Sequence, residues 1–169
     1  MIFMRQCIIL AAVVIGTASF GRAATVSSVL GVSASVPSVA TLTVSPVALP
    51  NVSSIGTTTA FSSLSLTCPA GNVLSIGLDG GANAVAGQRR MSNGTAYIKY
   101  NLYQPNAAGT AMSNPAVPWG NGGTTVVGSP FIATCSGANQ AFHVYAQVPA
   151  GQVLPSGLYT DAVTVILTY

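Results

Sequence analysis

The sequence predicts an all-β protein, and three observations support this prediction. Apolar and polar residues alternate with a period of two in several segments, as they do in half-buried strands. Clusters of Gly, Pro, Asn and Ser separate these segments about every 8–12 residues, a spacing typical of β-sandwiches and barrels. No segment has the pattern of an amphipathic helix. We therefore expect one domain of about seven to nine short strands.

The alternating segments give the expected strands in chain order. They cover residues 26–36, 40–47, 61–68, 73–78, 96–103, 124–127, 141–147 and 162–169. Residues 79–87 contain several turn-forming residues and predict a loop, and the adjacent pair Arg89-Arg90 is assigned to this looser region. Residues 105–123 are expected to form an irregular connection.

Residues 1–23 have the features of a secretion signal peptide. Arg5 gives a positive start, Cys7–Phe20 is an apolar run, and small residues precede a cleavage site after Ala23. A membrane anchor is the alternative, but the run is shorter than the roughly 20 residues that span a bilayer. The sequence therefore predicts export.

Charged residues are scarce, and the chain contains no Glu. Removing Arg5 and Arg22 with the signal would lower the formal charge from +3 to +1, so no basic stripe remains for nucleic acid. A surface so poor in charge suits a protein covered by neighbours. Arg89 and Arg90 could bind an anionic surface or glycan, or they could cap backbone carbonyls or pair locally.

The inventory of reactive side chains argues against catalysis. General acid–base chemistry uses paired carboxylates or a His with an orienting carboxylate, and the chain offers only Asp79, Asp161 and His143. His143 alternates with apolar neighbours and is interpreted as an edge or surface residue. Metal binding needs more ligands than His143 and two cysteines supply. We expect no catalytic residue, no metal and no cofactor, and a secreted hydrolase is the least favoured function.

Two cysteines, Cys68 and Cys135, remain once Cys7 leaves with the signal. An even number of cysteines in an oxidising compartment favours a disulfide. This bridge would close a loop of 135 − 68 = 67 residues and would contribute roughly 4 kcal/mol to stability. Two buried free thiols are the alternative.

The segment behind the signal is apolar on one side only. Its apolar side is formed by Val26, Leu30, Val32, Ala34 and Val36. A terminal segment of this kind could pair within its own domain as a first strand, or it could add to the sheet edge of another copy. The expected strand 162–169 reaches the last residue of the sequence.

Nine short motifs follow one another along the chain. They are Leu66-Thr-Cys68, Ser75–Gly81, Arg89–Met91, Tyr100–Tyr103, Trp119-Gly120, Val144-Tyr145, Val148–Gln152, Gly157–Asp161 and Leu167–Tyr169. In this order they resemble the spore coat protein U family, which includes the archaic (Csu-type) chaperone–usher pilins. The resemblance covers nearly all of the chain after the signal.

The resemblance implies an incomplete immunoglobulin-like β-sandwich of the pilin type, in which the last strand is missing. Residues 1–23 would be the signal peptide, 24–36 an N-terminal donor-strand extension, and 37–169 the pilin-like domain. The donor residues would be those of the apolar side named above. The acceptor groove would lie beside the C-terminal strand, at Val163, Val165, Leu167 and Tyr169 or at the opposite parity.

The implied function is that of a non-enzymatic structural subunit of a pilus or coat. A periplasmic chaperone would lend the missing strand, an outer-membrane usher would secrete the subunit to the cell surface, and other copies would polymerise with it. A surface adhesin or glycan-binding module is the alternative; it would need an exposed patch in residues 105–123, where Trp119 lies. Family members commonly carry an early cysteine near the position of Ala40, so the Cys68–Cys135 pairing rests on counting alone.

Overall fold

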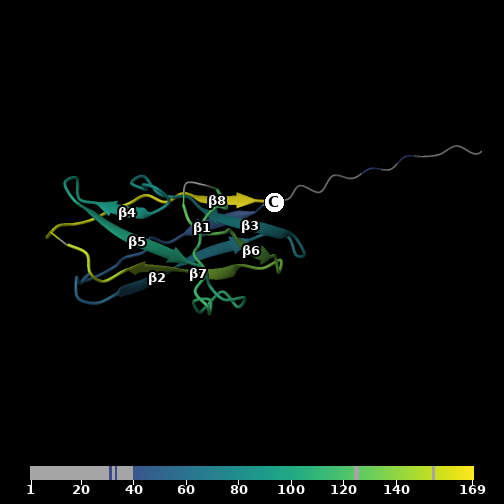
Figure 1. Ribbon diagram of the computed structural model, residues 1–169. Coiled ribbons are helices and arrows are strands. Elements are labelled where there is room, and N and C mark those ends of the chain that lie inside the picture. Colours follow the sequence, from purple (N-terminus) through teal and green to yellow (C-terminus); the bar gives the residue numbers. More distant parts are fainter. Residues whose placement is uncertain (1–30, 32, 34–39, 124–125, 154) are drawn as a thin grey trace, which may run out of the picture. The chain divides into compact units, whose positions relative to one another are not determined.

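The strands belong to one compact unit of the chain. The computed structural model describes residues 31, 33, 40–123, 126–153 and 155–169. The chain divides into the units Met1–Ser35 and Val36–Tyr169, and every described strand lies in the second unit (Figure 1). The predicted signal peptide and all five predicted donor residues lie outside the described residues.

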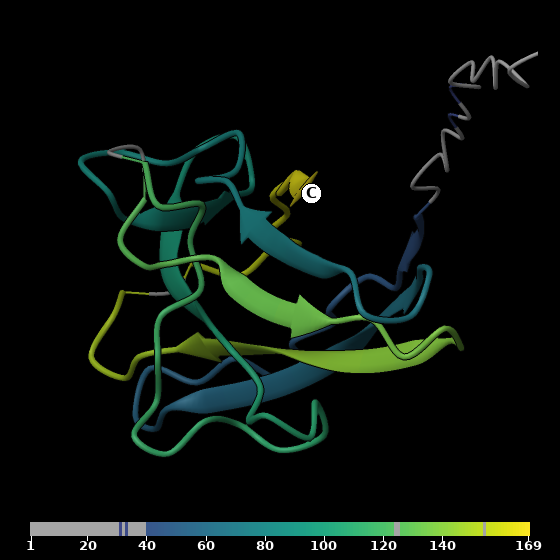
Figure 2. The same ribbon diagram turned by 90° about the vertical axis from the view of Figure 1, so that its right-hand side faces the viewer.

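Two antiparallel sheets make up this unit. The described strands are β1 (Thr41–Val44), β2 (Thr58–Thr67), β3 (Val73–Leu78), β4 (Arg89–Ser92), β5 (Tyr97–Tyr103), β6 (Phe131–Thr134), β7 (Gln140–Val148) and β8 (Val165–Thr168). One sheet has the order β1-β2-β7-β5-β4, and the other has the order β6-β3-β8. Figures 1 and 2 show the two sheets facing each other. The described residues include no helix, so the predicted all-β fold is confirmed.

Alternation along the strands creates the core. In β7, Phe142, Val144, Ala146 and Val148 are buried, while His143 and Tyr145 between them point outward. The inward residues of both sheets join in a single apolar cluster. Each fully buried Val, Leu or Phe contributes roughly 1.5–3 kcal/mol to stability. The alternation in the sequence therefore predicts which residues make the main stabilising contacts. No described helix is long and apolar enough to cross a membrane.

Trp119 lies between the sheets and is fully buried. Its indole Nε1–H donates to the Ile76 carbonyl at 2.7 Å, and its ring packs on Phe131 with 5.6 Å between centroids. Gly120 follows because the Gly128 backbone crosses here; a Cβ at position 120 would lie 2.5 Å from the Gly128 carbonyl oxygen. The Trp-Gly pair is therefore a packing motif.

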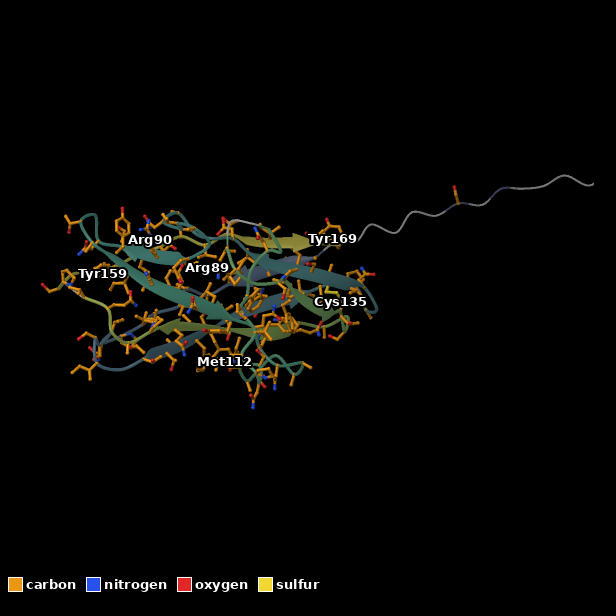
Figure 3. All side chains as sticks on the ribbon, viewed as in Figure 1. Arg89, Arg90, Met112, Cys135, Tyr159 and Tyr169 are labelled. Carbon is orange, nitrogen blue, oxygen red and sulfur yellow. A yellow bond between two sulfur atoms is a disulfide. The ribbon has the colours of Figure 1, made fainter. Side chains whose placement is uncertain are left out.

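A disulfide joins the two sheets. Cys68 follows β2 of the larger sheet, Cys135 follows β6 of the smaller one, and the two residues are bonded and buried. Figure 3 labels Cys135 at the end of the unit that also carries Tyr169. The bridge predicted from cysteine counting is confirmed, and the two-thiol alternative is wrong.

Three strand predictions need correction. Residues 126 and 127 are not a strand, and Val126 forms only an isolated bridge with Gly87; the strand of this region is β6, four residues further on. Arg89 and Arg90 begin β4 and do not lie in a loop. The last strand begins only at Val165, because the residues before it pair elsewhere.

Candidate functional site: an open groove between two edge strands

An open groove runs between one edge of each sheet. β1 is an edge strand of the larger sheet and β8 an edge strand of the smaller one. A cavity of about 910 Å³ lies between them, with residues 44–52 along one side and residues 155–163 and Val165 along the other. We call these two sides the β1 wall and the β8 wall. An edge strand carries backbone N–H and C=O groups that can pair with a further strand.

The floor of the groove is the core itself. Inward-facing side chains of three strands, β3, β5 and β7, line it, namely Leu78, Ile98, Leu102, Val144 and Ala146. Apolar residues on the walls are only partly buried, and Val44 keeps 45% of its surface exposed. Covering such surface stabilises by about 25 cal/mol per Å². The groove therefore favours an occupant with an apolar face.

Ser62 places a polar atom in this apolar lining. It lies on β2, faces inward and is nine-tenths buried, and its hydroxyl has no hydrogen-bond partner among the described residues. A buried hydroxyl without a partner costs about 1–3 kcal/mol. The hydroxyl is thus available to an occupant that brings a backbone or polar group.

The β8 wall is hydrogen-bonded on the side away from the groove. Thr160 exchanges two backbone hydrogen bonds with Ser92, the Ala162 carbonyl accepts from the N–H of Ala82, and the Thr164 carbonyl accepts from the N–H of Asp79. Alternation then leaves Val163 and Val165 facing the groove, and both line it. Leu167 packs on the core, and Tyr169 lies beyond the end of β8, largely exposed (Figure 3).

Two aspartates anchor the β8 wall. The Asp161 carboxylate accepts a hydrogen bond from the Tyr100 hydroxyl at 2.7 Å and another from the Asn83 side-chain amide at 3.1 Å. The Asp79 carboxylate accepts from the N–H of Thr164 at 2.8 Å. Gly81 beside them has φ of 78°, and a Cβ there would collide with the Asp161 carboxylate, so only glycine fits.

Arg89 ties this network to the core. It is only 3% exposed, and its guanidinium donates to the carbonyls of Leu78, Asp79 and Trp119 at 2.6–2.9 Å. Arg89 therefore caps backbone carbonyls, which is one of the roles that the sequence left open for the arginine pair. Arg90, on the opposite face, also caps a backbone carbonyl, because its Nε–H donates to the Asn83 carbonyl at 2.9 Å, and its guanidinium stacks on Tyr97, with 4.3 Å from Cζ to the ring centroid.

Burial and charge shift three pKa values in this network. Burial disfavours the ionised Asp79 carboxyl, but hydrogen bonds from Thr164 and Gly81 and the charge of Arg89 outweigh it and lower the pKa. Burial and the Asp161 carboxylate raise the pKa of Tyr100 far above its ordinary value. Burial also lowers the pKa of Arg89. The anchors of the β8 wall therefore hold charge-assisted hydrogen bonds at neutral pH.

His143 and Trp119 are the two remaining candidate residues of the sequence analysis. His143 lies on the outward face of β7, an interior strand, so the surface interpretation holds and the edge interpretation is wrong. Trp119 is buried, so it cannot form an exposed binding patch. The β1 wall was missed, although the spaced apolar residues Val47, Leu49 and Val52 could have indicated it.

Comparisons with known proteins find a matching family and a similar fold. The family model of the Spore Coat Protein U domain matches residues 1–166. "Protein U" of Myxococcus xanthus is 35% identical over 91 residues, which cover 53% of this chain and 45% of that protein.

One similar solved structure is the crystal structure of the CsuC–CsuE chaperone–tip adhesion subunit pre-assembly complex from archaic chaperone-usher Csu pili of Acinetobacter baumannii. Its TM-score is 0.54 at 18% identity, over 79% of this chain and 40% of that chain. The matched part is less than half of either relative. At this identity, the structural match concerns the fold.

Proposed function

Because the chain belongs to the Spore Coat Protein U domain family, we propose that it is a structural subunit of an extracellular pilus or coat. The observation that carries this proposal is the open groove, whose core floor lies between two edge strands. A sandwich that leaves its core open in this way is aggregation-prone unless another strand covers it. Its role is to be filled and to assemble, and it needs no catalytic step.

The proposed occupant is a donor strand, residues 24–36 of another copy or of a related subunit. Its apolar side would face the floor, and its backbone would pair with the edges of β1 and β8. The unpartnered hydroxyl of Ser62 supports a backbone occupant, since a purely apolar ligand would leave it unsatisfied. The acceptor residues would include Val163 and Val165, with Leu167 and Tyr169 continuing the same edge.

The proposed partners follow from this mechanism. The similar structure is a complex of a chaperone with a subunit of chaperone-usher pili, which supports a periplasmic chaperone as the first occupant of the groove. An outer-membrane usher and further subunits would follow. The chain would be exported through the periplasm to the cell surface. In residues 105–123, Trp119 is buried and cannot supply the exposed patch that the adhesin alternative needs; the exposed large apolar residues of this range are Met112 and Val117.

Two substitutions in the proposed donor strand test this function with a matched control. Val32→Asp puts a charge on the side that would enter the groove and should abolish fibres while chaperone co-purification persists. Ser33→Asp has the same charge at the opposite parity and should leave fibres intact. Electron microscopy and chaperone co-purification are the measurements. Fibres of normal length from Val32→Asp, or from a deletion of residues 25–36, would overturn the proposal.

A further inference from the structure

The outward face of the larger sheet carries a row of three aromatic residues. Phe61 on β2 is the register partner of Tyr145 on β7, and Tyr145 is the register partner of Tyr103 on β5. Their buried neighbours Ser62, Val144 and Leu102 show that this parity points away from the core. Since adjacent strands lie about 4.8 Å apart, the row spans roughly 10 Å.

Phe61 in this row is exposed, Tyr145 and Tyr103 are half-buried, and all three rings are held in place. Phe61 keeps 58% of its surface exposed and stacks on His143, with 4.7 Å between centroids. The Tyr145 hydroxyl donates to the Thr110 carbonyl at 2.9 Å, and the Tyr103 hydroxyl donates to the Gln147 side chain at 3.3 Å. Exposed aromatic groups with fixed orientation lose little entropy on binding.

A polar row lies next to the aromatic one. Thr59 and Asn101 are the register partners of Gln147 on either side, so a hydroxyl and two amides cross the same three strands. Two residues along a strand correspond to about 7 Å. A ligand lying on the aromatic row can therefore reach hydrogen-bonding groups beside it.

The charge of this face is positive. Lys99 on β5 is the register partner of Arg90 on β4, and both point outward. They are the described cations other than the buried Arg89. Both aspartates of the chain, Asp79 and Asp161, are bound in the network of the β8 wall. The described part of this face thus has two cations and no carboxylate side chain.

From these rows we infer that the outward face of β2, β7 and β5 binds an acidic polysaccharide strand. The apolar faces of sugar rings would stack on Phe61 and Tyr103, hydroxyls would bond to Gln147 and Asn101, and carboxylates would meet Lys99 and Arg90. A second copy packing through the same face would bring like charges together. Two cations are few for a nucleic acid, whose affinity depends on many phosphate contacts.

Binding of the exported full chain to immobilised alginate, a polyuronate, tests the inference. Phe61→Thr with Tyr103→Thr keeps β-forming side chains and should weaken binding by roughly tenfold. Lys99→Gln should weaken binding by about threefold and make it less sensitive to salt. Ile132→Thr replaces an exposed residue on the outer face of the other sheet and should change nothing. Circular dichroism and fluorescence of the buried Trp119 check that each variant is folded.

Three results would overturn the inference. They are no alginate binding at low salt, unchanged alginate binding by the aromatic double variant, and a loss of binding in Ile132→Thr equal to that of the double variant. Neutral dextran bound as tightly as alginate would refute the acidic ligand, and tighter binding of single-stranded DNA would assign the face to nucleic acid. Because none of these residues lines the groove, failure here leaves the donor-strand proposal standing, and the reverse also holds.

Discussion

The two walls of the groove are built in different ways. The β8 wall is held from behind by backbone hydrogen bonds and by the carboxylates of Asp79 and Asp161. In the β1 wall, the Ser45 N–H donates to the Ser63 carbonyl, and residues 46–52 are held within the described structure by packing of Val47, Leu49 and Val52 on the core.

On the proposed function, this difference would let one groove accept more than one strand. A wall fixed by directional hydrogen bonds sets the register of an incoming strand, because its edge is in place before binding. A wall held by apolar packing can shift as side chains of different size enter. We infer that the β8 wall is the template and the β1 wall the adjustable side.

The largest expected effect is a loss of stability at the β8 wall. Arg89→Met should lower the free energy of unfolding by about 3–5 kcal/mol, because it removes a buried charge and leaves three buried carbonyls without donors. Urea unfolding with the disulfide intact measures it.

Arg90→Gln is the matched control for that change. Its side chain is half-buried, stacks on Tyr97 and donates a single hydrogen bond to the Asn83 carbonyl, so the loss should be only about 1 kcal/mol. Equal losses in the two variants would contradict the buried-anchor role of Arg89.

At the β1 wall we expect a small effect on stability and a larger effect on strand binding. Leu49→Ala removes a partly buried side chain and should cost only about 1 kcal/mol in unfolding. Binding of a synthetic peptide of residues 25–36 should nevertheless weaken by about five- to tenfold, because Leu49 lines the groove. Fluorescence polarisation of labelled peptide measures this. Replacing Ile55, an exposed residue outside the groove, by Ala is the control.

Much of the fold could be predicted because its signal is local. The period of two located β3, β5 and β7 closely, since each has at least six residues in which burial alternates or is continuous. β6 was missed because four residues give too short a pattern, while the β-branched run near Val126 imitated a strand. Strand pairing decided between them, and pairing depends on residues distant in sequence.

The site was less predictable because its parts meet only in the folded chain. The burial of Arg89 depends on carbonyls of residues 78, 79 and 119, which no local pattern brings together. The Gly80-Gly81 turn looks like an ordinary loop until Asp161 is seen beside it. The resemblance to pilins directed attention to the C-terminal strand, so the spaced apolar residues Val47, Leu49 and Val52 of the β1 wall were not interpreted as part of a groove.

The last expected effect depends on pH and concerns Tyr100, which links the β8 wall to the core. Its pKa in the folded protein lies far above the ordinary value of 10.0, because burial and the Asp161 carboxylate favour the neutral phenol. The unfolded chain therefore loses this proton first as pH rises. Stability from this group is complete below about pH 10 and falls by about 1.4 kcal/mol per pH unit above it.

Tyr100→Phe should remove one proton from that slope and lower neutral stability by about 1–2 kcal/mol through the lost hydrogen bond to Asp161. Tyr97→Phe, which removes a hydroxyl at an exposed site on the same strand, is the matched control. Parallel slopes for all three proteins between about pH 9 and 11.5 would show that the hydroxyl of Tyr100 does not anchor the β8 wall.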